Sequence, residues 1–585
     1  MKNLTAETNK GPNITNLREL IYKHALLNAY KHGGKASLKH VVSKVIAEDP
    51  SLRSEIKNLM PTIREVIEQV NSMELSQQKK ELEEKYPDLL EEKREEEAKT
   101  LPPLPGADLK RNVVTRFAPN PDFVIHLGNS RVAILSHEYA RMYEGKFILR
   151  FEDTDPRTKT PLSDAYLLIK EDLSWLGIRW DEEYIQSLRM ETYYSVARKL
   201  IERGGAYVDT LSKEEFARLL KEGTTHPNRD DPPEDVLEKF DKMLEGAYGE
   251  GEAVLRVKTD WHHKDKSVVD WVAFRIIDTD KHPHPLTGSK YIVWPTYNFA
   301  AGVDDHLMGV THIIRGKEHA QNTVKQSFLY KHMGWQYPYT ISVGRLKLED
   351  FIMSKSVIRE ILSKTTGYYG HDDPRFATLS GLRKRGILPE SIRAIMIEVG
   401  VKKNDARISF DNLAAINRKL LDPIAPRLSF VPRPMQVTVV LDSKECLKSA
   451  IPLHPDRPEM GKREWRICSG DQLLIPMTDY LAHRGGEMRL MELGNFTIQD
   501  TEIKLVNTSL DYARRKKLSI IQWLPLNEAS NASILVPKGE RLEVLHGMVD
   551  KMAAKLENKL VQFYRIGFAK IERVYPMLQA IFAHE

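Results

Sequence analysis

The sequence predicts a multidomain protein with a helical N-terminal module, a central α/β region built on parallel strands, and a C-terminal region of β-barrels. Three observations support this architecture. The first hundred residues carry apolar side chains at helical spacing, strand and helix patterns alternate after Val113, and short strand candidates separated by turns dominate after residue 426. At 585 residues the chain also exceeds what one hydrophobic core usually supports, so we expect roughly three to five domains.

The composition is that of an ordinary globular protein, with 41% hydrophobic and 29% charged residues. The chain has no apolar run long enough to cross a bilayer and no apolar stretch at its N-terminus that would signal export, so we expect a cytoplasmic protein without a membrane partner. The 87 basic and 82 acidic residues permit a polyanionic partner without requiring one. Cys446 and Cys468 are too few for a disulfide framework or a multi-cysteine zinc site, and we expect free thiols.

Residues 1–100 are predicted to form the helical module and its charged linker. Helical apolar spacing covers residues 17–30 and 38–46, and Ile63, Val66 and Val70 belong to a further apolar stripe. Residues 77–99 are dominated by Glu, Lys and Arg, and the proline-rich residues 101–106 follow, which predicts a solvated helix and a stiff extended linker. We place a domain boundary at residue 100.

The central sheet begins with a strand that contains Val114 and Phe117. Two prolines end this strand, residues 130–143 carry helical apolar spacing, and residues 146–151 form a second strand candidate. A strand, a helix and a parallel strand make half of a nucleotide-binding sheet, in which ligands bind beyond the strand C-termini. Residues 101–210 are therefore predicted to form the first half of this domain.

The loop after the first strand has features of a phosphate site. A helix that begins near Asn129 presents free backbone N–H groups, Gly128 leaves room for a ligand, and His126 adds a donor. An ordinary proline-rich loop with a solvated histidine would give the same pattern. Glu152, in an acidic cluster after the second strand, could receive an ammonium group or could simply belong to a solvated turn.

The pattern changes between residues 211 and 290, where acidic helices and short strand candidates at 253–257 and 271–276 indicate an insertion. The strand–helix pattern resumes at residues 291–297 and continues through 312–316 into a helix near 323–332. Residues 291–345 are therefore predicted to form the second half of the sheet domain.

A second chemical site follows at residues 345–356. Ser354 and Ser356 flank Lys355, which gives hydroxyl donors and a compact positive charge suited to a triphosphate. Alone this stretch reads as a solvated loop, whereas in combination with the first loop it is far more specific.

Together these stretches resemble a known family. Residues 126–129 (His-Leu-Gly-Asn) resemble the HIGH motif and residues 353–356 (Met-Ser-Lys-Ser) the KMSKS motif of class I aminoacyl-tRNA synthetases, with Asn129 and Ile352 departing from those motifs. Residues 115–119, 149–155, 295–297, 417–419 and 422–427 are similar to the glutamyl- and glutaminyl-tRNA synthetases. Residues 454–461 are similar to the β-barrel region of glutaminyl enzymes and of glutamyl enzymes of the archaeal or eukaryotic type.

The resemblance implies a Rossmann-like class I catalytic domain with an acceptor-stem-binding insertion at 211–290. It further implies a helical stem-contact region with a KMSKS-like loop at 346–425 and β-barrel anticodon-binding domains at 426–585. The implied activity is that of a ligase, which attaches L-glutamate to tRNA(Glu) through a glutamyl-adenylate and releases AMP and pyrophosphate.

The implied catalytic residues are His126 and Lys355, which would stabilise charge that develops on the phosphates. Mg²⁺ would shield the triphosphate, with no protein side chain expected as a metal ligand. The resemblance assigns ATP binding to Pro119, His126, Gly128, Asn129, Arg345, Ser354 and Lys355.

The implied glutamate site consists of Arg116 for a carboxylate, Glu152 for the α-ammonium group, Tyr297 and Arg315. An arginine fork at position 315 pairs well with a side-chain carboxylate and poorly with an amide, which favours glutamate over glutamine. A structural ion pair at Arg315 is an alternative, as is a glutaminyl-tRNA synthetase.

The remaining expectations concern tRNA. A basic cluster between residues 364 and 385 is expected to contact the tRNA backbone, and the resemblance suggests an anticodon contact at Arg433. Charging of tRNA(Gln) and a protein partner for the N-terminal module are left open. A catalytically silent tRNA-binding scaffold is the alternative from another class. The basic cluster comprises Lys364, Arg375, Arg383, Lys384 and Arg385.

Overall fold

The computed structural model describes residues 14–31, 34–49, 52, 55–86, 101–107 and 113–585. The chain divides into two compact units, Met1–Thr100 and Leu101–Glu585. Most of the charged stretch predicted to lead into the linker, residues 87–100, lies outside the described residues.

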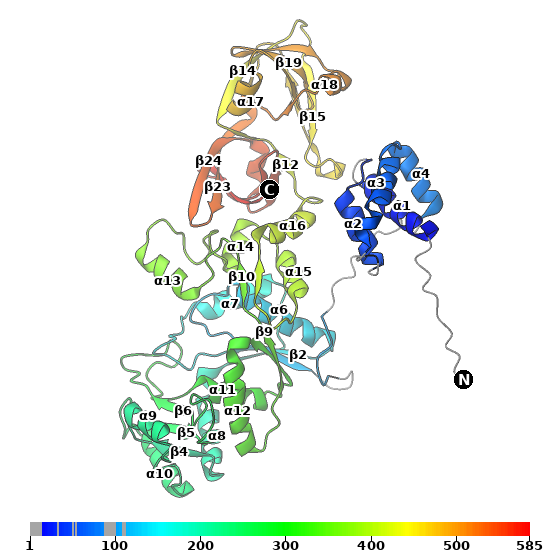
Figure 1. The fold of residues 1–585 in the computed structure, drawn as a ribbon. Helices are drawn as coiled ribbons and strands as arrows, with labels where there is room; N and C mark the ends of the chain where they lie inside the picture. Colours follow the sequence, from blue (N-terminus) through cyan, green and yellow to red (C-terminus); the bar gives the residue numbers. More distant parts are fainter. Residues whose placement is uncertain (1–13, 32–33, 50–51, 53–54, 87–100, 108–112) are drawn as a thin grey trace, which may run out of the picture. The chain divides into compact units, whose positions relative to one another are not determined.

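The first unit is helical, as the apolar spacing predicts (Figure 1). Its core includes Ile21 from the first helix, Val45 from the second and Ile63 from the third, all fully buried. The apolar stripe on each helix is therefore what joins the helices. The helices are α1 (Ile14–Lys31), α2 (Leu38–Glu48), α3 (Ile56–Asn71) and α4 (Leu75–Lys85).

The second unit begins with a parallel sheet made of two parts. One part has the order β1-β2-β3 and the other consists of β8 and β9, with parallel pairing throughout. Thr311, just before β8, joins the parts through its backbone N–H to the Val114 carbonyl at 2.9 Å. The strands are β1 (Val114–Phe117), β2 (Lys146–Phe151), β3 (Glu182–Ile185), β8 (His312–Gly316) and β9 (Tyr339–Val343).

The crossover from β1 to β2 needs a glycine at its end. Gly145 follows α6 (Leu127–Met142), and a Cβ atom there would lie 1.9 Å from the Val113 carbonyl oxygen. The backbone can pass this close to β1 only without a side chain. The chain then enters β2 on one side of β1, whereas β8 lies on the other side, so a ligand cleft is expected between the ends of β1 and β8.

The inserted segment forms an antiparallel sheet of order β4-β5-β6-β7. The structure differs here from the sequence prediction, because the strand expected to resume the parallel sheet pairs with β6 instead. Periodicity identifies a strand but not the sheet it joins. The strands of this sheet are β4 (Ala206–Asp209), β5 (Val254–Val257), β6 (Val272–Ile276) and β7 (Val293–Pro295), and α9 (Lys213–Glu222) and α10 (Pro233–Leu244) come between β4 and β5. The helices before and after it in the chain are α7 (Ala165–Trp175), α8 (Met190–Glu202), α11 (Tyr297–Leu307) and α12 (Ala320–Met333).

The proline-rich residues 101–106 are not a free linker. Leu101 and Leu104 are buried against Leu135 and Tyr139 of α6, and the Tyr139 hydroxyl donates to the Pro102 carbonyl at 2.9 Å. The linker prediction is wrong here because it rested on the proline content and overlooked the two leucines, which pack into the core of the second unit.

Residues 346–425 connect the sheet to the C-terminal region. A short parallel pair, β10 (Leu346–Leu348) and β11 (Ala406–Ile408), brackets three of four helices. These helices are α13 (Lys355–Lys364), α14 (Leu379–Arg385) and α15 (Pro389–Val399), followed by α16 (Phe410–Leu421).

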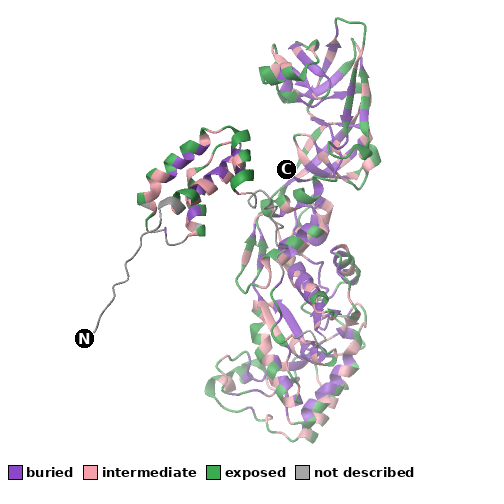
Figure 2. Cartoon of the chain, turned by 90° about the vertical axis from the view of Figure 1, so that its right-hand side faces the viewer, coloured by how far each residue is buried: buried purple, intermediate pink, exposed green. Residues whose placement is uncertain are grey.

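The C-terminal region contains two seven-stranded sheets, each around its own buried core (Figures 1 and 2). The predicted fold class is thereby confirmed. One sheet has the order β12-β25-β26-β27-β23-β24-β13, the other β21-β18-β19-β20-β14-β17-β22, and β15 and β16 form a hairpin. The elements are β12 (Arg427–Leu428), β13 (Phe430–Pro432), β14 (Pro434–Val440), β15 (Leu447–Pro452), β16 (Lys462–Ile467), β17 (Gln472–Pro476), α17 (Met477–His483), β18 (Glu487–Leu490), β19 (Gly494–Gln499), β20 (Glu502–Asn507), α18 (Leu510–Lys516), β21 (Ile520–Ile521), β22 (Leu524–Pro525), β23 (Ala529–Lys538), β24 (Arg541–Asp550), β25 (Leu560–Phe563), β26 (Gly567–Arg573) and β27 (Leu578–His584).

The expectation of free thiols is wrong. Cys446 and Cys468 form a disulfide with Cα atoms 4.2 Å apart. They extend the β15–β16 pairing, since Leu447 lies opposite Ile467. Counting cysteines could not reveal this, because the hairpin register alone brings them together. Separately, no helix in the described part of the chain is long and apolar enough to cross a membrane.

Candidate active site

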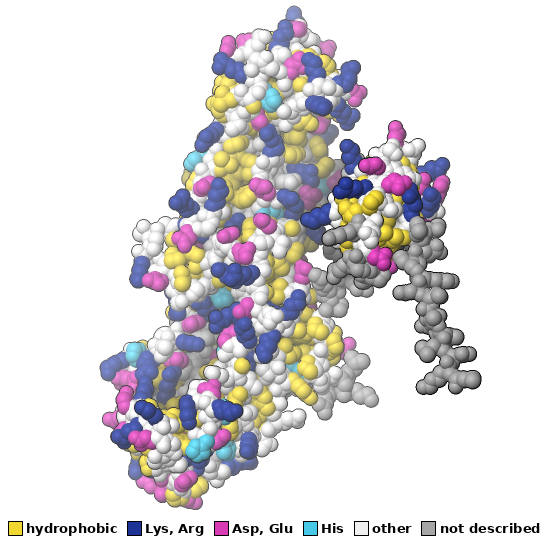
Figure 3. Space-filling view, viewed as in Figure 1, with side chains coloured by type: hydrophobic (Ala, Val, Ile, Leu, Met, Phe, Trp, Pro, Cys, Tyr) yellow, Lys and Arg dark blue, Asp and Glu magenta, His cyan; other side chains and the backbone are white. Residues whose placement is uncertain are grey.

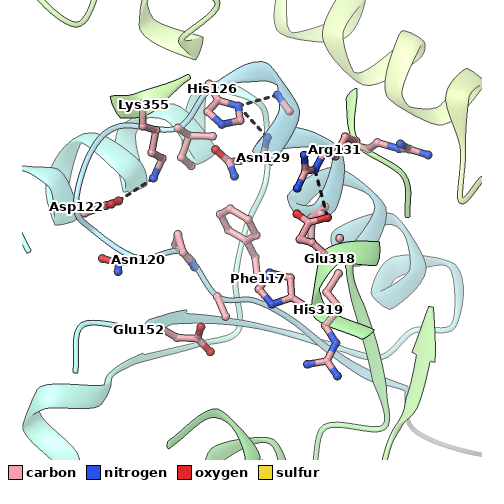
Figure 4. Close-up of a pocket in the computed structure, with 18 of the residues that line it drawn as sticks. Phe117, Asn120, Asp122, His126, Asn129, Arg131, Glu152, Glu318, His319 and Lys355 are labelled. Atoms are coloured by element: carbon pink, nitrogen blue, oxygen red, sulfur yellow. Dashed lines mark hydrogen bonds and ion pairs between the residues drawn. The ribbon is translucent and has the colours of Figure 1, made fainter. Parts of the chain in front are cut away.

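A cavity of about 1140 Å³ opens at the C-terminal ends of β1 and β8, where the sheet topology places a ligand cleft (Figure 4). All the residues predicted to bind ATP or glutamate line it, whereas Arg433 does not. The cavity brings together Arg116, Pro119, His126, Gly128, Asn129, Glu152, Tyr297, Arg315, Arg345, Ser354 and Lys355.

His126 caps helix α6. Its Nδ1 accepts hydrogen bonds from the backbone N–H groups of Gly128 at 3.0 Å and Asn129 at 3.4 Å (Figure 4). Burial, together with the charge of Lys355, lowers the pKa of His126 to about 4, so the ring is neutral near pH 7 and carries its proton on Nε2. His126 is therefore a neutral donor toward the cavity.

The expectation of free N–H groups at the start of α6 is wrong. The N–H of Leu127 donates to the Ala377 carbonyl at 2.9 Å, and the next two N–H groups are bound to His126. Gly128 lines the cavity as expected and has a second role, because a Cβ atom there would lie 2.9 Å from the His126 ring. The glycine lets the histidine fold over the helix end, and Nε2–H takes the place of the backbone donors.

Lys355 ties the second loop to the first. It begins α13, and its Nζ lies 3.0 Å from Asp122 Oδ1 in the loop after β1 (Figure 4). Ser354 bonds to Ser356 through their hydroxyls at 3.0 Å. Arg345 is largely exposed at the mouth, where its backbone N–H donates to Asp405 at 2.7 Å. Lys355 and His126 thus face one end of the cavity.

Asn129 and Asn120 add a further feature to this end. The side-chain oxygen of each is buried and has no hydrogen-bond partner among the described residues. A buried amide oxygen without a partner costs free energy, so a ligand that donates hydrogen bonds, such as a ribose or an adenine amine, would satisfy both.

Two buried arginines share one carboxylate at the other end of the cavity. Asp305 Oδ1 lies 3.1 Å from Arg116 Nε and 2.9 Å from Arg150 Nη1, and Arg150 also contacts Glu152 at 3.0 Å. Burial raises the pKa of Asp305, but the two arginines outweigh it and hold the pKa below its ordinary value. Burial destabilises the charged form of Glu152 and so raises its pKa. A cationic ligand group beside Glu152 would stabilise that charge.

Arg315 is a buried cation whose partners are all neutral. Its Nη1 donates to Gln326 at 3.2 Å, and its Nη2 donates to Tyr337 at 3.0 Å and to Thr323. The side chain is only 5% exposed, and no carboxylate of the described residues lies within ion-pair distance. The alternative of a structural ion pair is not what the structure contains.

Sequence reasoning missed Asp305, Asp122 and His319. The first two hold predicted site residues in place, and the third lines the cavity beside Tyr297. Only Asp305 left a signal, since Asp304 and Asp305 end the apolar run at residues 299–303. The other two are recognisable only once the loops are folded together.

Comparison with known proteins agrees with this geometry. Residues 112–423 match the model described as "tRNA synthetases class I (E and Q), catalytic domain", and residues 425–512 match the corresponding anti-codon binding domain. The chain is 52% identical to a glutamate–tRNA ligase of Aeropyrum pernix over 97% of this chain and 99% of that protein, and 52% identical to one of Ignicoccus hospitalis over 97% and 100%.

The chain belongs to the class I glutamyl- and glutaminyl-tRNA synthetases.

A crystal structure of a glutamate tRNA ligase from Elizabethkingia meningosepticum is also similar, with a TM-score of 0.40 and 24% identity over 54% of this chain and 70% of that one.

Only some of the residues expected to contact tRNA lie at the surface of this synthetase. Arg433 is exposed at the turn between β13 and β14. Arg375 and Arg385, by contrast, are buried: the first pairs with Asp373 at 2.8 Å, and the second lies over the Phe410 ring at 4.2 Å. Their prediction as surface contacts is wrong, because Arg375 lies in a turn where Asp373 binds its guanidinium, and Arg385 ends α14 with its guanidinium turned into the core.

The other members of the basic cluster reach the surface. Lys364 is exposed, Arg383 is partly exposed, and Lys384 pairs with Asp372 at 2.7 Å. Figure 3 shows basic and acidic side chains interspersed over the visible face of the synthetase. A tRNA surface is therefore not marked by one basic patch on that face.

Proposed function

We propose that this chain attaches L-glutamate to tRNA(Glu) in two steps. A carboxylate oxygen of glutamate attacks the α-phosphorus of ATP, which gives glutamyl-adenylate and releases pyrophosphate. The 3′-terminal adenosine hydroxyl of tRNA then takes the glutamyl group and releases AMP. Membership of the family and the names of the relatives support this reaction.

The observation that carries the choice of glutamate is the uncompensated charge of Arg315. Arg116, Arg150 and Arg315 bring three positive charges to this end of the cavity, against at most two negative charges from Asp305 and Glu152. Glutamate carries one net negative charge and offsets the excess, whereas glutamine is neutral and would leave Arg315 buried and unpaired.

The other end of the cavity fits the phosphates of ATP. His126 Nε2–H and Lys355 Nζ are donors that could strengthen their contact as negative charge develops during transfer. Lys355 would exchange its contact with Asp122 for one with phosphate. Mg²⁺, which binds readily through phosphates, would enter with the nucleotide and neutralise part of its charge.

Pyrophosphate exchange tests this proposal directly. The chain should catalyse glutamate-dependent ATP–pyrophosphate exchange, with and without tRNA being compared, and should charge a tRNA(Glu) transcript. Arg315→Gln should lower kcat/KM for glutamate by about 10³-fold or more, since it removes a buried charged partner worth several kcal/mol. Exchange with glutamine alone would favour the glutaminyl alternative, and no exchange under either condition would favour the silent scaffold.

The finer expectations belong to this proposal. We keep tRNA(Gln) as a second substrate to be tested with its own transcript, and a protein partner of residues 1–100 to be tested by co-purification. The acceptor-stem role of 211–290, the anticodon role of Arg433 and a cytoplasmic location stay predictions.

A further inference from the structure

His319 lies at the glutamate end of the cavity and has no role in the reaction so far. It ends a short turn that follows β8, four residues after Arg315, and its side chain lines the cavity (Figure 4). Its ring lies 5.6 Å from the Tyr297 ring, centroid to centroid, at an angle of 45°. Tyr297, a predicted glutamate contact, therefore packs beside it, and Arg315 lies near enough for its charge to act on the ring.

The hydrogen bonding of His319 defines what it offers to a ligand. The Asn322 amide nitrogen lies 3.0 Å from Nδ1, and an amide N–H can only donate, so Nδ1 is the acceptor. Burial lowers the pKa of His319, and the nearby charge of Arg315 lowers it further, so the ring is neutral. A neutral ring with Nδ1 as acceptor carries its proton on Nε2, and no described residue is recorded as a partner of that nitrogen.

Arg315 alone cannot donate hydrogen bonds to both oxygens of a ligand carboxylate. A guanidinium binds a carboxylate bidentately through Nε and Nη2 or through Nη1 and Nη2, and both edges use Nη2. Here Nη2 already donates to Tyr337 and Thr323. The free fork expected from the sequence is therefore absent. Arg315 has N–H groups left on Nε and Nη1 for single bonds, and the second carboxylate oxygen needs another donor.

We propose that His319 donates its Nε2–H to the side-chain carboxylate of the amino acid, beside Arg315, and so sets the choice of glutamate. This rests on the proposed function. Arg315 supplies the charge, and His319 supplies the second direction of hydrogen bonding. An amide side chain offers only one acceptor oxygen, so it could not satisfy both donors at two oxygens.

Two variants separate the hydrogen bond from the packing. His319→Phe keeps a ring beside Tyr297 but removes the donor, and should raise the KM for glutamate in pyrophosphate exchange by roughly 10- to 100-fold, as expected for a hydrogen bond to a charged group. The KM for ATP should stay within about threefold. His319→Gln restores an N–H donor and should recover most of the loss.

His306→Phe is the matched control, because His306 stacks on Trp335 at 3.9 Å and does not line the cavity. It should leave both KM values unchanged. If His319→Phe does not fold, as judged by circular dichroism, His319→Ala takes its place with the same expectation.

An unchanged KM for glutamate in a folded donor-free variant would overturn the role of His319, as would an equal rise in the KM for ATP or a failure of His319→Gln to recover activity. The wild-type chain keeps the two proposals apart. Wild type without glutamate-dependent exchange overturns the proposed function and this inference together, whereas an active wild type with an indifferent His319→Phe overturns only the inference.

Discussion

His126 combines two tasks that a sequence motif cannot separate. Its Nδ1 closes the N-terminus of α6, and this bond fixes the proton on Nε2, where a phosphate would lie. The first task is a contribution to stability and the second a contribution to chemistry. A substitution that keeps one and removes the other distinguishes them.

His126→Asn is such a substitution, because asparagine caps helices well through its side-chain oxygen. We expect pyrophosphate exchange to fall by about 10²- to 10³-fold through loss of the donor to developing charge, with little change in Tm. His126→Ala should lose activity similarly and also lose about 1 kcal/mol of stability with the cap. Exchange rates and thermal melting measure both. An active His126→Asn variant would show that the ring does not reach the phosphates.

The pH dependence of stability gives a second, independent check on His126. Its folded-state pKa is about 4, below the ordinary value of about 6.5. Between these values the unfolded chain binds a proton that the folded chain does not, so this residue lowers stability as pH falls from 6.5 to 4. The stability of His126→Asn relative to wild type should therefore increase over that window in urea unfolding. A constant difference would mean that the ring takes up its proton at the same pH in the folded and unfolded chains.

Helices and strands with strong periodicity were predictable, and their partners were not. The sequence placed β1, α6 and β2 closely, because apolar runs end at prolines and a glycine. The short strands expected after residue 426 are present as well, but two that are neighbours in sequence lie at opposite edges of one sheet, with β21 paired with β18 and β22 paired with β17. Strand pairing depends on contacts distant in sequence, which one chain's local pattern does not contain.

The residues of the candidate site were likewise predictable, whereas their bonding partners were not. The resemblance supplied residues that the fold does bring to one cavity, such as Arg116 and Lys355. Their partners, Asp305 and Asp122, come from segments about 190 and 230 residues away, and only the folded sheet reveals them. The free fork expected at Arg315 is also absent, because Thr323 and Tyr337, 8 and 22 residues further along the chain, occupy Nη2 once the chain is folded.

The β15–β16 hairpin offers a test of the one covalent link. The disulfide closes a loop of 22 residues, which should stabilise the C-terminal region by about 3 kcal/mol. Reduction with dithiothreitol should lower the urea midpoint of unfolding accordingly, followed by tryptophan fluorescence, since Trp465 of β16 packs on Trp523. A Cys446→Ser/Cys468→Ser variant should have the urea midpoint of the reduced protein, and dithiothreitol should not change that midpoint. Identical midpoints for oxidised and reduced wild type would contradict the link.

The second unit is held together by buried polar contacts between distant segments. The Arg385 side chain of α14 donates through Nε to the Ala583 carbonyl of β27 at 3.1 Å, and Asn417 of α16 contacts His584 at 2.9 Å. Burial lowers the pKa of Arg385 to about 9, so this cation is held at a cost. The last strand is therefore an integral part of the unit that carries the site.

The division of the chain predicts where the activity resides. Every residue that lines the cavity belongs to the unit Leu101–Glu585. A chain that begins at Leu101 should therefore keep the wild-type rate of glutamate-dependent pyrophosphate exchange and its melting temperature for this unit. Exchange assays and calorimetry on the shortened chain measure both. A loss of exchange would mean that residues 1–100 act on the site itself.

A second shortened chain, beginning at residue 107, is the control that makes this cut informative. It also removes Leu101 and Leu104, which cover Leu135 and Tyr139 of α6. Burial of each leucine contributes about 1.5–3 kcal/mol to stability. The free energy of unfolding of this chain should therefore be roughly 3–6 kcal/mol lower than that of the chain that begins at Leu101. Because α6 carries His126 at its N-terminus, the exchange rate should fall with the loss of folded protein. Equal stability of the two shortened chains would show that the proline-rich segment is the free linker its composition suggested, and that the unit begins after it.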